Sequence, residues 1–537
     1  MHSQAEYHEM TNIGQQALQT TTEVTYEKGS GTRKVCLVGL GFSVLVGVIF
    51  FLLGCIVPHR FNGEDDVIAF SPVGLELLTL GIDFAVLIVT EINGYVSIVY
   101  GSVLGALLRL EQTHLISGGY SNCPMRFSPS NPASFEQIHS LSLRGALYHE
   151  GRLDFNSSLR LLTVAKETPA NGLLANIAYF ITLSFCYGAA SVVVVRNTYV
   201  IRAEALGSLA DEWEKHSHDA NFSRVGPLGL GFAILIQCAL SIWCLQSQTF
   251  ASWDSGPLTT LAAFGLRGDE LIAQPGTSEA RPSRSDKRRS PYASHPRVRL
   301  ALAIVTVVFL AFMVWTALLI PYGIRNQPRG SWVFFPTSTN GDDDEDPNTM
   351  TIFLKFFKVH NEVYENRGGT LGPDYVSESN LFGILLLYVV LQSLVTIGLH
   401  SAELQVLMLR DEATWQKSSA CGSTSWSSFS SVMAPLRSPP NAVLLLFKPV
   451  LHWFFAICLS VDYAQGMAMR APQTAYLTAA WAIFVIFAYG ISFYRPRGAL
   501  PLTYGRLSTM REKEIERLNG GGGGGGGGDL ARDGGGR

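Results

Sequence analysis

The sequence predicts an all-α, polytopic helical membrane protein with eight transmembrane helices and disordered termini and loops. Two observations lead to this fold class. The 537-residue chain is 47% hydrophobic and only 15% charged, whereas an ordinary soluble domain carries about 25% charged residues. The charges also lie between apolar blocks of roughly 20 residues, the length a helix needs to cross a hydrocarbon core. Lipid offers the backbone no hydrogen-bond partner, so each block is expected to be helical.

The apolar blocks divide the chain into spans and connecting segments. The expected spans are 35–57 and 73–95, 175–195 and 227–247, 300–321, 381–400, and 443–462 and 474–494, so that paired spans occupy 35–95, 175–247 and 443–494. Between and around them we expect a disordered N-terminus (1–34), a loop with an insert (96–174, insert 96–137), a basic loop (248–299), an acidic loop (322–380), a Ser-rich loop (401–442) and a tail with polyglycine (495–537).

Lysine and arginine in the connecting segments predict the orientation, because these residues favour the cytoplasmic side of a membrane. With the N-terminus inside, the inner segments hold 28 basic residues and the outer segments hold 11. Both termini are therefore expected in the cytoplasm of a plasma-membrane or endomembrane protein. The stretch 96–109 could form a ninth span, which would invert every later segment, but a surface-lying or re-entrant stretch is the preferred interpretation.

Three carboxylates accompany the second predicted span. Glu76, Asp83 and Glu91 are seven and eight residues apart, so on a helix they fall on one face. A charged side chain at the centre of a bilayer costs about 2.5–3.5 kcal/mol on insertion scales. This face is therefore expected to pack inward or to line water, with Asp83 deepest.

Lys448 and His452 are the candidate partners of these carboxylates. They lie four residues apart in the seventh predicted span and share one helix face. A carboxylate opposite a Lys/His face would suit a proton- or cation-coupled carrier, and a buried structural pair would look the same. Because Lys448 could also reach an interface with its long side chain, the structural interpretation is preferred.

Signatures of enzymes, metals and cofactors are absent from the sequence. There is no HExxH, GxSxG, P-loop or strand-linked GxGxxG motif. None of the eight cysteines forms a CxxC pair, and the twelve histidines are dispersed. A net charge of −3 gives no bias towards nucleic acid. We expect no catalytic residue, metal or cofactor, a lipid bilayer as the main partner, and protein partners at the cytoplasmic loops. Asn221 begins a glycosylation sequon on the expected outer side.

Three blocks of the chain resemble a family of uncharacterised multi-pass membrane proteins of filamentous fungi. In that family an Ile-His-x-x-Ser-Leu-Arg block leads into a Glu-Gly-Arg-Leu-x-Phe-Asn-x-x-Leu-Arg-Leu core, and a run ending Thr-Tyr-Gly-His-Leu follows the last span. The matching residues here lie in 138–162, then Ser252-Trp253 and Gly256-Pro257, then Arg495-Pro496-Arg497-Gly498, Pro501, Thr503-Tyr504-Gly505 and Leu507. The resemblance implies a membrane location and a common topology, and it implies no activity.

The chain departs from this family pattern in two places. After Leu507 it runs into a charged segment and polyglycine instead of an acidic continuation ending in Trp. Gly94-Tyr95 is also separated from Ile138 by residues 96–137. The insert begins with Val-Ser, which a GTAAGT splice donor would encode, and it ends with Gln, which a CAG acceptor would encode. Our hypothesis is a retained intron.

The sequence leaves two main functional hypotheses. The first is a non-enzymatic membrane organiser that acts on partners or lipid through its basic inner loops. The second is an ion- or proton-coupled small-solute carrier or channel that uses the intramembrane carboxylates. A carrier predicts one polar cavity lined by Asp83 and the Lys448/His452 face, whereas an organiser predicts a tightly packed interior. A membrane enzyme ranks third because no catalytic signature is present.

Overall fold

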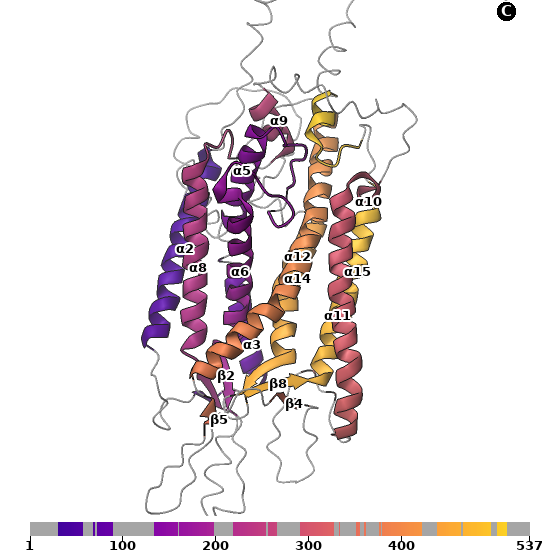
Figure 1. Ribbon diagram of the computed structural model, residues 1–537. Helices are drawn as coiled ribbons and strands as arrows, with labels where there is room; N and C mark the ends of the chain where they lie inside the picture. Colours follow the sequence, from indigo (N-terminus) through magenta and orange to yellow (C-terminus); the bar gives the residue numbers. More distant parts are fainter. Residues whose placement is uncertain are drawn as a thin grey trace, which may run out of the picture.

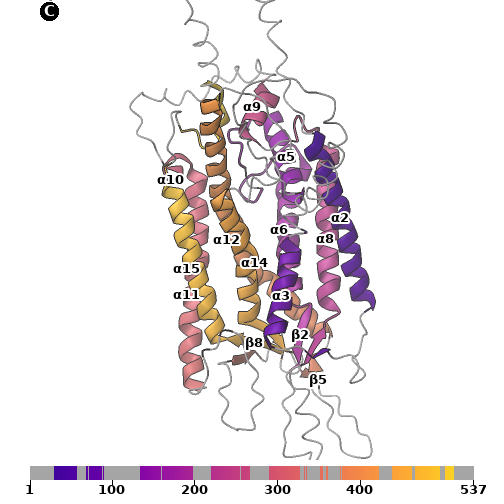
Figure 2. The ribbon, with the colours of Figure 1, turned by 180° about the vertical axis from the view of Figure 1, so that it is seen from behind.

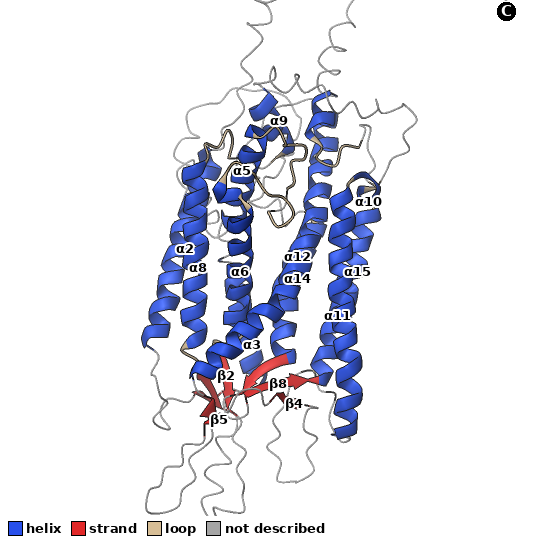
Figure 3. Cartoon of the chain, in the orientation of Figure 1, coloured by secondary structure: helices blue, strands red, loops and turns tan. Residues whose placement is uncertain are grey.

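The computed structural model confirms an all-α polytopic membrane fold (Figures 1 and 3). Long helices run side by side along one axis, with a small sheet at one end and short helices and loops at the other. The described residues are 30–56, 68–69, 72–87, 89, 134–158, 160–197, 219–253, 256–265, 290–326, 332, 334, 351–354, 359–360, 375–376, 378–421, 438–462, 466–495 and 502–512. Residues 1–29 of the predicted disordered N-terminus, most of the insert 96–137, the Ser-rich stretch after Cys421 and the polyglycine lie outside them. Residues 30–34, predicted as disordered, are instead the start of a helix.

Seven helices in the described part of the chain are long and apolar enough to cross a membrane. They are α2 (Ser30–Ile56), α6 (Leu173–Ala190), α8 (Val225–Ser247), α11 (Pro296–Asn326), α12 (Glu378–Cys421), α14 (Pro439–Cys458) and α15 (Ala471–Phe493). Each coincides with one of the expected apolar blocks, because a continuous apolar run of this length can satisfy its backbone in lipid only as a helix.

An additional crossing is required by the path of the chain. Helix α2 ends near strand β1 (Ile68–Ala69), whereas α5 (Ser134–His149) lies at the opposite end of the bundle (Figure 2). The chain therefore returns between residues 69 and 134. Helix α3 (Pro72–Leu87) begins this return and packs against α14 and α6. The remainder of the predicted second span, including Glu91, lies outside the described residues.

Interlocking apolar side chains from the spans form one continuous core. Helix α8 packs between α2 and α6, α12 joins α6 to α11 and α14, and α15 closes against α11 and α14. The outward faces are also apolar: Leu174 is 81% exposed, Ile486 71% and Leu318 70%. Apolar surface of this extent requires a nonpolar environment around the bundle, which agrees with a membrane location.

A small sheet covers one end of the bundle, which we call the strand end. Its order is β1-β3-β2-β7-β8-β4, and a separate pair is formed by β5 and β6. The strands are β2 (Val194–Asn197), β3 (Asp219–Phe222), β4 (Thr351–Leu354), β5 (Val359–His360), β6 (Tyr375–Val376), β7 (Leu459–Asp462) and β8 (Gly466–Arg470). The sequence predicted no strands. One of the strands, β7, replaces the last four residues of the predicted helical span 443–462.

The opposite end carries a folded layer that we call the cap. It consists of α5, residues 150–172 with the short helix η3 (Pro169–Asn171), α9 (Pro257–Gly265), α10 (Pro291–Ser294), the last turns of α12 and residues 502–512. Arg33, near the start of α2, lies 6.0 Å from the ring of Trp253 beside the cap. Both ends of the described chain, residues 30 and 512, thus lie at the same end of the bundle, which requires an even number of crossings.

Helix α12 differs most from its expected boundary. The predicted span ended at residue 400, with a Ser-rich loop following, but the helix continues to Cys421. The charged residues after position 400 suggested solvent, yet Glu403, Asp411 and Glu412 are all buried. Leu404, Met408 and Trp415 on the same stretch of the helix are buried as well. The extension is therefore helical because one of its faces packs into the cap.

The α2–α8 interface generates a first prediction. A Cβ added at Gly231 would lie 2.7 Å from the Gly47 carbonyl oxygen and closer still to the Phe51 backbone nitrogen, whereas one added at Gly41 meets nothing within 4 Å. Gly231→Ala should therefore destabilise the purified protein by about 1–3 kcal/mol through overpacking. Gly41→Ala should change its stability by less than about 1 kcal/mol and in the stabilising direction. Thermal unfolding in detergent measures both, and equal effects would contradict close packing of the two backbones.

Candidate functional site

Lys448 of α14 is paired inside the bundle with a carboxylate that the sequence analysis placed in a loop. Its Nζ donates to Oε2 of Glu403 at 3.2 Å, and Nδ1 of His400 lies 3.0 Å from the same oxygen. Lys448 and Glu403 are both buried. Removing a single partner of such a pair leaves an uncompensated charge, which is strongly destabilising. This group therefore ties α12 to α14.

His452, one turn beyond Lys448, belongs to a second polar group. Its Nδ1 donates to Oε1 of Gln392 at 2.7 Å, and the Gln392 amide nitrogen lies 3.4 Å from the hydroxyl of Ser191. The ring of Tyr187 stacks on the imidazole with centroids 3.6 Å apart. The group connects α6, α12 and α14, and it fixes the imidazole by a hydrogen bond on its edge and an aromatic ring on its face.

The carboxylates of α3 have different surroundings from one another. Glu76 lies at the strand end, where Oε1 is 3.7 Å from a guanidinium nitrogen of Arg470. Asp83 is 2% exposed, and its Oδ1 accepts no hydrogen bond from the described residues. The structure thus packs α3 against α14. Lys448 of α14 nevertheless pairs with Glu403 of α12 and not with a carboxylate of α3. Glu91 lies outside the described residues.

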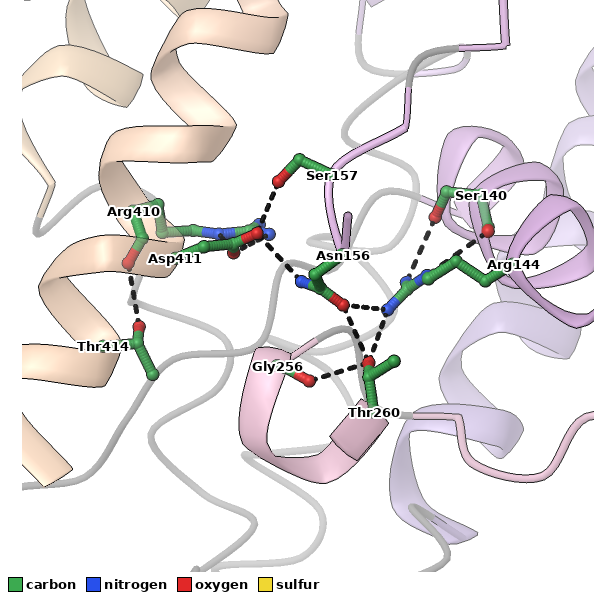
Figure 4. Close-up of polar contacts among 9 residues, drawn as sticks. All are labelled: Ser140, Arg144, Asn156, Ser157, Gly256, Thr260, Arg410, Asp411 and Thr414. Carbon is green, nitrogen blue, oxygen red and sulfur yellow. Dashed lines mark hydrogen bonds and ion pairs between the residues drawn. The ribbon is translucent and has the colours of Figure 1, made fainter. Parts of the chain in front are cut away.

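A buried carboxylate near the end of α12 organises the cap (Figure 4). Asp411 is fully buried, and its Oδ2 accepts hydrogen bonds from the Asn156 amide at 2.9 Å and from the Ser157 hydroxyl. Asn156 in turn accepts from the Arg144 guanidinium at 3.0 Å and from the Thr260 hydroxyl at 2.8 Å. A single amide therefore links α5, α9 and α12 through the loop after α5.

The next residue of α12 holds the C-terminal segment of the cap. Glu412 Oε2 accepts from the backbone N–H groups of Thr503 at 2.8 Å and Tyr504 at 2.6 Å. Tyr504 and Gly505 both have positive φ, 47° and 77°, which turns the chain back sharply. A Cβ at Gly505 would lie 3.2 Å from the Asp411 carboxylate, so glycine suits this turn for both its conformation and its size.

The two held segments are also joined to each other. The Asn156 N–H donates to the Gly505 carbonyl at 2.9 Å, and the Leu507 N–H donates to the Asp154 carbonyl at 2.9 Å. Asp411 and Glu412 thus bind a two-segment unit through its side chains and its backbone. We call the two carboxylates and the residues they bind, 156–157 and 503–504, the α12 clamp.

Arg160 anchors the cap to the spans beneath it. Its guanidinium donates to the Ala170 carbonyl at 2.7 Å and to the Asn176 side chain, and it lies 5.3 Å from the ring of Tyr179. Burial is the main cause that lowers the pKa of Arg160. The side chain is nevertheless a cation at any physiological pH. Loop 150–172 is therefore held to α6 by a charge-assisted contact.

Many of these residues belong to the blocks that carry the family resemblance, which assigned them no site. The blocks 138–162, 252–257 and 503–507 are far apart in the chain, yet their described residues lie together in the cap. The binding residues Asp411 and Glu412 were missed because charged residues after an apolar span suggest a solvated loop. A helical pattern of apolar residues continuing beyond position 400 was the signal that could have found them.

Two further predictions from the sequence concern a metal site and a glycosylation site. Among the described residues, no group of three or more His, Cys, Asp or Glu side chains could hold a metal ion. Asn221, the predicted glycosylation site, is paired in register with Val195 in the β3–β2 ladder at the strand end. Comparisons with models of known protein families, with curated proteins and with solved structures found no match to this chain.

The α12 clamp generates a second prediction. Asp411→Ala leaves the buried Asn156 amide and Ser157 hydroxyl without their acceptor, so it should destabilise the purified protein by about 3 kcal/mol. Ser157→Ala should cost about 1–2 kcal/mol, whereas Ser158→Ala, whose hydroxyl makes only a 3.5 Å contact with the Phe155 carbonyl, should cost less than about 0.5 kcal/mol. Limited proteolysis of the cap and thermal unfolding measure these effects. Equal losses for Ser157→Ala and Ser158→Ala would contradict the clamp.

His295, between α10 and α11, generates a prediction about pH. Burial, with Arg297 as the next cause, lowers its pKa from 6.5 to about 4. The unfolded chain therefore binds a proton at higher pH than the folded chain, and stability is lost as the pH falls from 6.5 towards 4. The melting temperature should decrease from pH 6.5 to about 5, above the range where most carboxyl groups titrate. His295→Gln should reduce this slope, and an unchanged slope would show that His295 is not the group responsible.

Proposed function

We propose that this protein is a non-enzymatic organiser of its membrane, which presents the cap to partners on the cytoplasmic side. The observation that carries the proposal is the α12 clamp: segments from both halves of the chain are bound by buried carboxylates into one folded surface. Loops that served only as connections would not need two buried charges to hold them. The predominance of basic residues in the connections at the cap end supports a cytoplasmic orientation.

The pairing of ionisable groups in the spans also supports this proposal. Lys448 is bonded to Glu403, and His452 is bonded to Gln392 and stacked on Tyr187. A carrier must exchange the partners of such groups during transport, whereas here they join α6, α12 and α14 to one another. The cap segments are also the ones that resemble membrane proteins of filamentous fungi, and we retain that family membership as a proposal.

One observation favours the second candidate, a proton- or cation-coupled carrier. Asp83 is buried in α3 without a hydrogen-bond donor to Oδ1 among the described residues. An unpaired buried carboxylate is costly, so this position favours a proton or a cation as its counterpart. A carboxylate of this kind within a membrane helix is a functional candidate by default.

Two variants separate the candidates. Asp411→Ala removes the carboxylate that holds the cap segments, whereas Asp83→Asn removes the intramembrane acid at nearly constant volume. In cells, proximity labelling from the cap should identify a set of neighbours with the wild-type protein and with Asp83→Asn. That set should be lost with Asp411→Ala while the protein stays in its membrane. Arg299→Gln, at an exposed position near the start of α11, serves as the control at the cap end.

Proteoliposomes containing the purified protein provide the opposing test. The organiser predicts no protein-dependent flux of protons or small cations, with or without Asp83. A flux that Asp83→Asn abolishes would overturn the proposal and establish the carrier. Neighbours that remain unchanged when the cap is opened would likewise contradict an organising role for the cap.

A further inference from the structure

A pocket of about 380 Å³ opens in the cap beside the start of α11. Its walls come from three separate parts of the chain: the segment 147–163, residues 294–297 and Arg506. The volume falls in the range of small-ligand sites, about 300–1,000 Å³. The pocket borders the α12 clamp, since Phe155 and Ser158 flank the two residues bound by Asp411, and Arg506 follows Gly505.

Arginines dominate the charge of this pocket. Arg152, Arg297 and Arg506 all line it, and Asp154 is the one acidic residue among the lining residues. Asp154 lies 3.3 Å from Arg506, in a pair that is about half exposed on both sides. Arg152 is bonded to Glu150 outside the pocket at 2.7 Å. The pocket therefore retains an excess of positive charge.

Of the three arginines, Arg297 has the least negative charge close to its guanidinium group. Its guanidinium donates to the neutral hydroxyl of Thr163 at 2.6 Å, and no ion pair of Arg297 exists among the described residues. It is half-buried in the first turn of α11, where the helix dipole adds partial positive charge. Arg299, two residues further on, is exposed and lies outside the pocket.

Neutral polar groups complete the lining. The hydroxyl of Thr163 accepts from Arg297 and so keeps its own proton for a ligand. The hydroxyls of Ser158 and Ser294 also border the cavity, but they donate to the carbonyls of Phe155 and Ser290. The Nδ1 atom of His295 accepts a hydrogen bond from the backbone N–H of Arg297 at 3.0 Å. The neutral imidazole therefore carries its proton on Nε2 and remains a donor. Three guanidinium groups with hydroxyl and imidazole donors match an anion that has several acceptor oxygens, and planar guanidinium groups bind phosphate oxygens in pairs.

We propose that this pocket binds a phosphomonoester of an inositol phosphate type, either as a lipid headgroup or as a soluble molecule. Arg297, with the partly compensated Arg152 and Arg506, supplies the positive charge for the phosphate groups, and Phe155 supplies an apolar part of the wall. This inference rests on the proposed function only for the source of the ligand, since a cap on the cytoplasmic side would meet inositol lipid headgroups at the membrane surface. The pocket itself does not depend on the organising role.

The test uses the full-length protein in detergent and in nanodiscs. Soluble inositol trisphosphate is titrated against the detergent-solubilised protein, with inorganic sulfate at equal ionic strength as the reference. The lipid source is tested with phosphatidylcholine nanodiscs containing phosphatidylinositol bisphosphate, or phosphatidylserine at the same total charge. Arg297→Gln and Arg506→Gln should each weaken inositol phosphate binding about tenfold, as expected for the loss of one charge-assisted contact. The matched control Arg299→Gln should leave it unchanged.

The arms of this experiment give distinct results. Binding of both the soluble and the lipid probe, with mutual competition, supports the pocket for either source, and binding in nanodiscs alone assigns it to the lipid. Arg297→Lys, which keeps the charge, should retain part of the affinity and guards against a variant that only misfolds. Absence of binding to either probe, or an equal loss with Arg299→Gln, would overturn the proposal. Neither result would affect the neighbour-labelling test of the organising role.

Discussion

The hydrocarbon core of a membrane supplies no hydrogen-bond partner, and this constraint shapes the bundle. It makes each span helical and leaves apolar side chains such as Leu174 and Ile486 facing outward. It also decides where ionisable groups can lie. Lys448 meets Glu403 and His400 inside the bundle, because a buried charge needs a partner supplied by the protein. The same contacts that satisfy these groups hold neighbouring helices together.

Beyond the bundle, the α12 clamp has the corresponding role for the cap. Asp411 and Glu412 are adjacent on one helix, yet they bind different segments, one through side chains and the other through backbone N–H groups. Because α12 is also a span, the cap is attached directly to a membrane helix. A change in the packing of α12 would therefore reach both the cap and the Lys448–Glu403 pair, 45 positions apart in the chain but joined at 3.2 Å.

The cap also explains why residues that resemble a family block can lie far apart in sequence. Arg144, Asn156 and Thr260 meet within about one hydrogen-bond length of one another, with contacts of 2.8–3.0 Å. The Thr503–Gly505 turn closes against them through Asp411 and Glu412. The arginine-lined pocket forms at the edge of this unit, so its geometry depends on the clamp. Binding and cap stability are thus expected to be linked, since a ligand that binds only the folded cap stabilises it.

The sequence by itself determined the membrane class and the positions of seven long apolar helices in the described part of the chain, because the length and apolarity of each block are local properties of the chain. It also marked Glu76, Asp83, Glu91, Lys448 and His452 as candidate polar groups of the spans. Only the tertiary structure decided their partners. Lys448 pairs with Glu403, a residue that the sequence pattern placed in a loop. It likewise decided the end of α12, the strands of the strand end and the pocket of Arg152, Arg297 and Arg506. These features join residues that are distant in the chain, and whether a charge is solvated or buried depends on what packs against it.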